Sequence, residues 1–242
     1  MKGALGLLRS LAIYHNPVSL LRWRRFYRDL LRPGDLAFDI GAHVGTRSRT
    51  MHWAGARVVA IEPQAPFTQF LRRSLPRGID VLDVAVGAAS GQMELAVSSR
   101  HPTVSTLNAN FVHAGRAARG FEHVRWDRAQ RVDVLRADDV IAQYGVPRYI
   151  KIDVEGGEAD VLAGLSHPVE VISAEYLPAM PDLAHELVAR LAAIGNDRFN
   201  VVQGETGRFL WPDWRAGDHF KSWLAAQDSS AMSGDLFARR GA

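Results

Sequence analysis

The spacing of hydrophobic and polar residues along the chain predicts an α/β fold. Short runs rich in β-branched and apolar residues predict strands, and the segments between them have the three-to-four-residue periodicity of helices. The predicted strands of this series are 36–40, 57–61, 79–86, 149–152, 169–175, 199–203 and 236–239. The predicted helices are 46–54, 65–75, 137–144, 158–165 and 181–193. Strands that alternate with helices in this way form a parallel sheet whose two faces are covered.

The middle of the chain departs from this alternation. Residues 91–97 (GQMELAV) alternate like an exposed antiparallel strand, and residues 124–134 form another predicted strand. Between them, residues 101–120 show little periodicity and are predicted to be a long loop. Because long loops in compact domains are often lids or binding loops, we expect this one to serve a site.

Near the N-terminus the pattern predicts a basic amphipathic helix over residues 18–32, ended by a Pro-Gly-Asp turn. Apolar residues such as Trp23 and Phe26 alternate in it with five arginines. Two interpretations are open: the helix packs on the domain with its arginines in water, or it is a surface helix attracted to anionic lipid or to a phosphorylated acceptor. No composition break marks a second domain, so we expect a helical extension at 1–32 and one domain at 33–242.

Composition excludes several classes of protein. Hydrophobic residues make up 47% and charged residues 23% of the 242 residues, which is ordinary for a globular protein and excludes disordered and collagen-like chains. The chain has no cysteine, which excludes a disulfide framework, a thiolate nucleophile and cysteine-ligated metal sites. This composition agrees with a cytoplasmic location, which we expect. No apolar run is long enough to span a membrane, and no signal peptide is expected.

The basic balance of the chain is too weak to indicate a nucleic-acid partner. Lysine and arginine number 29 and aspartate and glutamate 26, so the net charge is +3. A nucleic-acid-binding protein more often has a clustered basic stripe interleaved with aromatic residues. We therefore expect a small-molecule acceptor rather than a nucleic acid.

The first predicted strand leads into a glycine turn, in the stretch LAFDIGAHVGT. The strand carries Asp39, the turn runs from Gly41 to Gly45, and a helix begins near Thr46. Glycines allow a sharp bend and the close approach of a ligand, and ligands of open parallel sheets bind beyond the carboxyl ends of the strands. A dinucleotide site needs G-x-G-x-x-G, but His43 and Thr46 occupy its second and third glycine positions. The Asp39 carboxylate suits instead the ammonium group of S-adenosylmethionine.

Two further carboxylates follow predicted strands. Glu62 comes after the second strand, seventeen residues beyond Gly45. An acidic residue in this position accepts the hydroxyls of a ribose, which indicates an adenosine-type ligand without separating a nicotinamide cofactor from S-adenosylmethionine. Asp83, in LDVAVG, is a candidate acceptor for the adenine amino group, with Ala85 and Val86 against the ring. A surface position is the alternative for Asp83.

A second candidate site lies in YIKIDVEGGE, after the fourth strand. Asp153, Glu155 and Glu158 fall within six residues, and such crowding needs compensation from Lys151, a helix N-terminus, a cation or a cationic ligand. It also raises carboxyl pKa values toward the range of a general base. Glu175, at the end of the fifth strand, is expected to face the same rim. The alternatives are a first-turn helix carboxylate for Glu158 and an arginine partner for Glu175.

Together these blocks resemble the FkbM-type methyltransferase family. The blocks are DIGAHVGT, VVAIEP, LDVAVG, YIKIDVEGGEADVLAGL, VISAEY and GDLFAR, and KIDVEGxE is the most specific of them. The resemblance covers residues 36–175 well and 233–239 more loosely. It implies a Rossmann-like class I methyltransferase fold with a seven-stranded, mostly parallel sheet, the last strand antiparallel, and helices on both faces. It also implies methyl transfer from S-adenosylmethionine, usually to a hydroxyl oxygen on a sugar, glycan or natural-product scaffold.

The resemblance implies roles for single residues as well. The expected cofactor contacts are Asp39, Gly41, His43, Gly45, Thr46, Glu62, Asp83 and Asp153. The expected catalytic residues are Asp153, Glu155 and Glu175, with Asp153 or Glu155 accepting the acceptor's proton and Glu158 on the rim; no metal ligand is expected. His43 departs from the family, whose turns commonly have asparagine or glycine there, so its titration near neutrality predicts a pH-dependent cofactor affinity. We expect the acceptor to be recognised by residues 1–32 and 101–120.

Three other functions remain open. A catalytically silent nucleotide-binding module that regulates a partner would keep the same fold. A nicotinamide-dependent oxidoreductase is disfavoured by the missing dinucleotide fingerprint. Methyl transfer to nitrogen would keep the fold and the cofactor, but a neutral amine would need no strong base.

Overall fold

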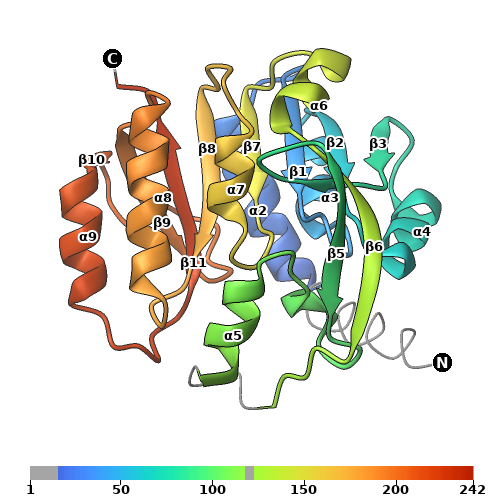
Figure 1. Cartoon of the computed structure of the whole chain (residues 1–242). Coiled ribbons are helices and arrows are strands. Elements are labelled where there is room, and N and C mark those ends of the chain that lie inside the picture. Colours follow the sequence, from blue (N-terminus) through green and yellow to red (C-terminus); the bar gives the residue numbers. More distant parts are fainter. Residues whose placement is uncertain (1–15, 118–122, 242) are drawn as a thin grey trace.

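The computed structural model describes residues 16–117 and 123–241, and in this part of the chain helices cover both faces of a large central sheet (Figure 1). The order of its eight strands is β10-β9-β11-β8-β7-β1-β2-β3. They are β1 (Leu36–Ile40), β2 (Arg57–Ile61), β3 (Ile79–Leu82), β7 (Tyr149–Ile152), β8 (Val171–Tyr176), β9 (Arg198–Gln203), β10 (Arg215–Ala216) and β11 (Gly234–Arg239). A second sheet, in the order β4-β6-β5, comprises β4 (Ala85–Val86), β5 (Gly91–Val97) and β6 (Arg128–Leu135).

The pairing of the strands confirms the predicted fold class. β1 lies in the middle of the parallel part, between β2 and β7, and β3 and β8 extend the parallel ladder on either side. β11, the last strand in the chain, is antiparallel to both β8 and β9. The described sheet therefore has the seven expected strands, mostly parallel with an antiparallel last strand, and adds the two-residue β10 at its edge.

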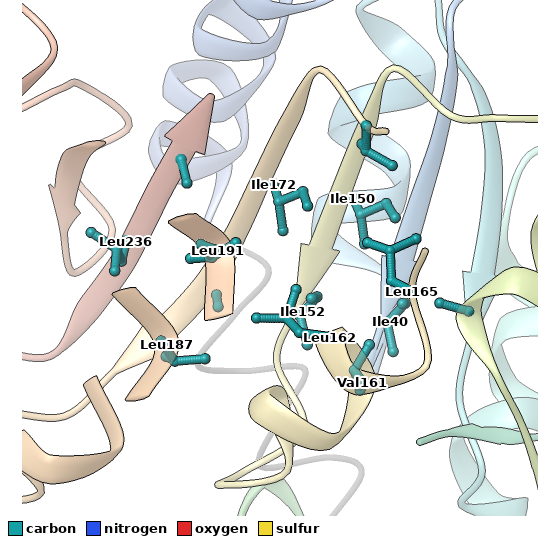
Figure 2. Close-up of a cluster of buried hydrophobic side chains, with 14 of the residues drawn as sticks. Ile40, Ile150, Ile152, Val161, Leu162, Leu165, Ile172, Leu187, Leu191 and Leu236 are labelled. Atoms are coloured by element: carbon teal, nitrogen blue, oxygen red, sulfur yellow. The ribbon is translucent and has the colours of Figure 1, made fainter. Parts of the chain in front are cut away.

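One face of the sheet is covered by α6 (Ala137–Tyr144), α7 (Glu158–Ala163), α8 (Pro181–Ala193) and α9 (Gly217–Ala225). Because successive strand residues point to opposite faces, Ile40, Ile150 and Ile152 all lie on this side. They pack against Leu162 of α7 and Leu187 of α8 in one buried cluster (Figure 2). This cluster holds the central strands in register, so the ends of β1 and β7 stay next to each other.

The opposite face packs against α2 (Pro17–Leu30), α3 (Thr46–Trp53) and α4 (Ala65–Ser74). The Asn16 side chain caps α2 by accepting a hydrogen bond from the backbone N–H of Val18. Trp23, Phe26 and Tyr27 are buried against the sheet, so this predicted helix is part of the hydrophobic core. The domain division at residue 32 stays a prediction. Of the helices in the described ranges, none has the length and apolarity needed to cross a bilayer.

The predicted strand 79–86 is divided between the two sheets. β3 ends at Leu82, whose carbonyl accepts the backbone N–H of Glu62, and the chain then joins the second sheet as β4, parallel to β6. The ladder between β2 and β3 ends here because the backbone N–H of Gln64, the next donor on the β3 side, donates to the Glu62 carboxylate instead. The strands predicted at 91–97 and 124–134 correspond to β5 and β6.

Two other segments correct the sequence-based expectation. The predicted loop 101–120 contains a 3-10 helix, Pro102–Val104, and α5 (Ala109–Ala117); residues 118–122 lie outside the described part. Asn108 begins α5 because its Oδ1 accepts the backbone N–H groups of Asn110 and Phe111. The segment before β11, for which no element was predicted, contains β10 and α9, and Phe220 and Leu224 of α9 are buried.

Candidate functional site

A cavity of about 370 Å³ opens at the carboxyl edge of β1, β2 and β7, a volume typical of a small-molecule site. Its wall combines the turn after β1, the end of β2, the segment around β4, part of β5, the segment after it and the turn after β7. Seven of the predicted site residues line it: Asp39, Gly41, His43, Thr46, Glu62, Asp153 and Glu155. Gly45, Asp83 and Glu175 are not in the wall. The common cavity follows from the parallel strands, whose carboxyl ends meet at one edge.

The glycine turn brings the ends of β1 and β7 together. Gly41 has φ +83, and a Cβ there would come within 1.8 Å of the Asp153 carbonyl oxygen. Gly45, also with a positive φ, faces the side chain of Leu71 rather than the cavity. Both glycines allow the sharp bend and the close packing of the turn, and Gly41 also lines the cavity. Thr46, the first residue of α3, lines the cavity.

The buried Glu62 carboxylate is held by the backbone. Its Oε2 accepts the N–H of His43 at 2.9 Å, and its Oε1 accepts the N–H of Gln64 at 2.8 Å. Burial raises its pKa to about 7, although the two backbone hydrogen bonds act in the opposite direction. A carboxylate has about four acceptor positions, so each oxygen retains one for a ligand hydroxyl.

Asp39 is a second buried carboxylate at this edge. Its Oδ2 accepts a hydrogen bond from Ser48 Oγ, whereas its Oδ1 is buried without a partner among the described residues. Burial raises its pKa, and Lys151 nearby opposes the rise. An unpaired buried acceptor is costly unless something donates to it, so this oxygen is suited to a cationic or hydrogen-bond-donating ligand.

Lys151 balances the negative charge of Asp153, the first carboxylate after β7. Its Nζ is buried and lies 2.7 Å from Asp153 Oδ2. Burial alone would lower the pKa of Lys151, but the charges of Asp153 and Asp39 outweigh it and raise the pKa. Burial would likewise raise the pKa of Asp153, whose side chain is 36% exposed, yet the Lys151 ammonium keeps that pKa below its usual range. Asp153 is therefore ionised and paired at neutral pH.

Glu155 and Glu175 are crowded beside that pair. Carboxylate oxygens of Asp153, Glu155 and Glu175 all lie within 4.8 Å of one another, a spacing that a metal ion would also accept. Burial, followed by the charge of Asp153, raises the pKa of both glutamates well above its usual range. In contrast to Asp153, both glutamates hold a proton more strongly than an ordinary carboxylate does. The expectation of no metal stays a prediction.

The turn that carries Glu155 is held in an uncommon conformation. Glu155 has φ 58 and Gly156 has φ +88, and a Cβ on Gly156 would overlap the ring of Phe111. Glu158 Oε1 accepts the N–H groups of Val154 and Gly156 at 3.0 and 3.2 Å. Such left-handed residues persist only where surrounding contacts enforce them. Glu158 thus holds this turn from its position in the first turn of α7, which was the alternative considered for it. It does not line the cavity.

The long segment after β5 also reaches this turn. Asn108 Nδ2 donates a hydrogen bond to the Gly156 carbonyl oxygen at 2.5 Å. The residue that caps α5 therefore contacts the turn that carries Glu155. Thr103 and Ser105, from the same segment, line the cavity. Sequence reasoning placed acceptor recognition in this region without seeing the contact with Gly156, which joins residues 48 positions apart.

Two predictions do not agree with the geometry. Burial lowers the pKa of His43 to about 4, so this histidine stays neutral around pH 7 and does not titrate as expected. Its ring packs against Phe67, with 4.3 Å between centroids. Asp83 lies outside the cavity wall, where it accepts a hydrogen bond from Thr68 and pairs with the exposed Arg72. Its neighbours Ala85 and Val86 do line the cavity.

A polar group that the sequence did not indicate closes the wall beside α2 and α3. Arg47 and Glu205 line the cavity, and the two Arg47 Nη atoms each lie 3.1 Å from a Glu205 carboxylate oxygen. Trp23 Nε1 of α2 donates to the same carboxylate at 2.6 Å, and the Arg47 guanidinium lies over the Trp23 ring. No local signal in the sequence points to this group, because its members come from three distant segments.

Comparison with known proteins gives matches in sequence and in structure. Residues 39–229 match the family model described as the methyltransferase FkbM domain. The chain is also 30% identical over 158 residues to "31-O-demethyl-FK506 methyltransferase FkbM" of Streptomyces tacrolimicus. That match spans 56% of this chain and 61% of the relative, so the chain spans less than two thirds of the relative's length.

Two solved structures are similar over most of the chain. One is the precorrin-6y C5,15-methyltransferase from Geobacter metallireducens GS-15, at 13% identity and a TM-score of 0.48, covering 93% of this chain and 87% of that one. The other is the magnesium protoporphyrin IX methyltransferase (ChlM) from Synechocystis PCC 6803 with bound SAH, at 11% identity and a TM-score of 0.48, covering 96% and 86%.

Proposed function

The chain belongs to the FkbM methyltransferase family, and from this premise we propose that it transfers a methyl group from S-adenosylmethionine to a hydroxyl oxygen of a sugar, glycan or natural-product scaffold. The observation that carries the proposal is that two different kinds of carboxylate line the same cavity. Its wall includes a backbone-held carboxylate of the ribose-binding kind, Glu62, and also the Glu155 carboxylate with a raised pKa. A methyl donor and a hydroxyl acceptor each need one of these two groups.

The residues around the glycine turn fit S-adenosylmethionine. Glu62 retains one acceptor position on each oxygen for the two ribose hydroxyls. The unpaired Asp39 Oδ1 is suited to the ammonium of the methionine part, and Ala85 and Val86 offer an apolar wall for the adenine ring. When bound, the cofactor supplies an electrophilic methyl group attached to a sulfonium. The charge of that sulfonium is complementary to the neighbouring acidic residues.

Glu155 is the best-placed proton acceptor in this proposal. A hydroxyl group has to lose its proton as it is methylated, and an effective base has a pKa near the working pH. Asp153 is paired with Lys151 and has a lowered pKa, which makes it the weaker base. Glu155 lines the cavity and has a raised pKa, and Glu175 lies behind it as a second proton holder. Asp153 and Lys151 then orient the turn and set its electrostatic potential.

The acceptor class follows from the family and from the polar groups of the wall. The relative from Streptomyces tacrolimicus is named for the 31-O-demethyl form of FK506, and oxygen methylation is the corresponding proposal for this chain. Thr103 and Ser105 offer hydroxyl groups on the side of the cavity formed by the segment after β5. Alignment of the acceptor oxygen with the methyl group would supply most of the rate enhancement, up to ~7–11 kcal/mol.

Calorimetry and mass spectrometry test the proposal together. Titration with S-adenosylhomocysteine is expected to show binding, and incubation with S-adenosylmethionine and a panel of hydroxylated sugars, glycans and macrolides is expected to give a product heavier by one methylene group. Binding of NADH in place of S-adenosylhomocysteine would refute the proposal. Products formed only from amines would establish nitrogen methylation, and cofactor binding without any product across the panel would favour a regulatory module.

A further inference from the structure

The outward face of α2 is a strongly basic surface that does not line the cavity. At 100° per residue, the buried side chains of Trp23, Phe26 and Tyr27 fill one side of the helix. The opposite arc carries Val18, Leu21, Arg22, Arg24, Arg25 and Arg28, all exposed, and we call these six residues the arginine face. Asp29, also exposed on this arc, is the one acidic residue of the helix.

The arginines of this face have no acidic partner within the described residues. No ion pair joins any of the four to an aspartate or glutamate of that part of the chain. Arg24 Nε donates instead to the carbonyl oxygen of Trp53 at 3.3 Å. Elsewhere arginines such as Arg47 and Arg148 are paired with carboxylates. The positive charge of α2 is therefore available to an external anion.

Apolar side chains are exposed among these arginines. Val18 is 55% exposed and Leu21 is 65% exposed, and Trp53, next to Arg24, is 43% exposed. Exposed single apolar residues are ordinary, but here three lie in one basic patch. Trp and Leu side chains flanked by arginines are typical of helices that lie in the headgroup region of a bilayer.

A groove at the edge of the patch is lined by arginine and apolar side chains. Its volume is about 400 Å³, and Arg22 and Arg25 line it together with Arg208 from the segment after β9. Phe26 and Phe209 form its apolar part, and Asp29 is its one acidic residue. Guanidinium groups bind phosphate oxygens through two parallel N–H donors, so the groove combines phosphate recognition with an apolar floor.

We propose that the arginine face docks the protein onto the surface of an anionic phospholipid bilayer. Charge attraction brings the four arginines and Arg208 to the headgroups, and burial of Val18, Leu21 and Trp53 at the acyl boundary adds the hydrophobic contribution. A soluble polyanion would satisfy the arginines but would leave these apolar side chains in water. The inference is independent of the proposed reaction.

The inner side of α2 contacts the wall of the cavity. Ser19 and Trp23, on the inner side of the first turns of α2, both donate to the Glu205 carboxylate, which lines the cavity. In Figure 1 the start of α2 and α5 lie toward the same end of the molecule. The helix proposed to dock on the membrane is thus also in direct contact with the cavity wall.

Co-sedimentation of the full chain with vesicles tests this proposal. At an ionic strength of ~0.15 M, we expect binding to vesicles that contain phosphatidylglycerol and no binding to pure phosphatidylcholine vesicles. The triple variant Arg22→Glu, Arg25→Glu, Arg28→Glu is expected to weaken binding at least about 100-fold. Failure of the unmodified protein to bind the anionic vesicles would overturn the proposal.

A matched variant separates the patch from net charge. Arg125, Arg128 and Arg131 are exposed around β6, and changing all three to Glu shifts the net charge by the same amount, from +3 to −3. We expect this control to keep most of the vesicle affinity, and an equal loss would show that only overall charge matters. Circular dichroism of both triples confirms that each is folded.

Two further experiments distinguish a bilayer from other binding partners. Val18→Ser with Leu21→Ser is expected to weaken vesicle binding several-fold, whereas Val146→Ser with Met232→Ser, also at exposed apolar positions, is expected to have no effect. Glycerol phosphate at the same phosphate concentration is expected not to compete. If it displaces the vesicles completely, or if RNA binds more tightly than vesicles, the bilayer is not the partner.

Discussion

The carboxylates on the two sides of the cavity have opposite environments: on one side they accept hydrogen bonds, and on the other they repel one another. At the ends of β1 and β2, Glu62 accepts two backbone N–H groups and Asp39 accepts a serine hydroxyl. On the acidic side, Glu155 lies in the cavity wall and Glu175 lies next to it, outside the wall. Their carboxylates accept no hydrogen bond from a described residue and repel one another and Asp153. The first half is already organised for one ligand, whereas the second is destabilised until a proton or a cation arrives.

This contrast assigns the two halves different tasks. A pre-organised carboxylate lowers the cost of binding a cofactor of constant shape. A crowded pair of glutamates with raised pKa values is suited to holding and releasing a proton during each turnover. Substitutions in the first half should therefore change cofactor affinity, and substitutions in the second half should change turnover.

The largest effect is expected in the acidic half. Glu155→Gln removes the proposed proton acceptor and is expected to lower kcat by roughly 100- to 10,000-fold. Calorimetry with S-adenosylhomocysteine should show an unchanged affinity. Glu94→Gln, at an exposed position on β5, is the matched control and should behave like the unmodified protein. Full activity of Glu155→Gln would remove this residue from the mechanism and leave Asp153 and Glu175 to be tested in the same way.

In the half formed by β1 and β2, a large effect is expected on cofactor affinity instead of on kcat. Glu62→Gln replaces a charged acceptor by a neutral amide and is expected to weaken S-adenosylhomocysteine binding by roughly 10- to 150-fold. At saturating S-adenosylmethionine, kcat should stay within a few-fold of the unmodified value. Loss of kcat at saturation, with the affinity intact, would contradict the division of tasks.

The pH dependence of cofactor affinity sharpens the same assignment. Because burial raises the pKa of Glu62 to about 7, its carboxylate is ionised above that pH and becomes protonated as the pH falls through it. The ionised form is the one that accepts both ribose hydroxyls. The affinity for S-adenosylhomocysteine should therefore be full above pH 7 and fall below it, approaching about tenfold per pH unit.

Glu62→Gln is the control for this titration, since it should remove the pH dependence as well as the affinity. His43, whose pKa is lowered to about 4, does not change its charge over this range. A Glu62→Gln variant that keeps the full pH dependence would assign it to another group, and Asp39 is the next candidate.

The smallest effect is expected from the contact between α5 and the acidic turn. Asn108→Asp keeps an oxygen to cap α5 but removes the Nδ2 donor to the Gly156 carbonyl, so it isolates that hydrogen bond. We expect kcat to fall by about 2- to 12-fold, with cofactor affinity and helix content unchanged. An unshifted pH profile and an unchanged kcat would show that the contact does not position Glu155.

Much of the fold follows from short-range patterns. The bounds of β1 and β2 were predicted residue by residue, because each is a buried apolar run with a glycine or proline soon after it. The meeting of Glu62 and Asp153 in one cavity was also predictable, since parallel strands end at the same edge of a sheet. The family resemblance rests on the same local blocks, and the family model covers them.

The failures share one cause. The start of α5 has an asparagine cap that could have been recognised, but the burial of Phe111 against Gly156 depends on a turn far away in the chain. The predicted titration of His43 rested on the ordinary pKa of histidine, whereas burial in the folded protein lowers that pKa. The predicted adenine contact of Asp83 rested on its position after a strand. Its side chain instead contacts Thr68 and Arg72.

Hydrophobic spacing, the glycine turn and the order of the carboxylates were enough to establish the α/β architecture, the family and the edge of the sheet where ligands bind. They are local properties of the chain, and each constrains the backbone over only a few residues. Which carboxylate is neutralised, which keeps a proton and how α2 reaches Glu205 were settled by packing. Charge, burial and desolvation depend on groups brought together from distant segments, so their balance exists only once the chain has folded.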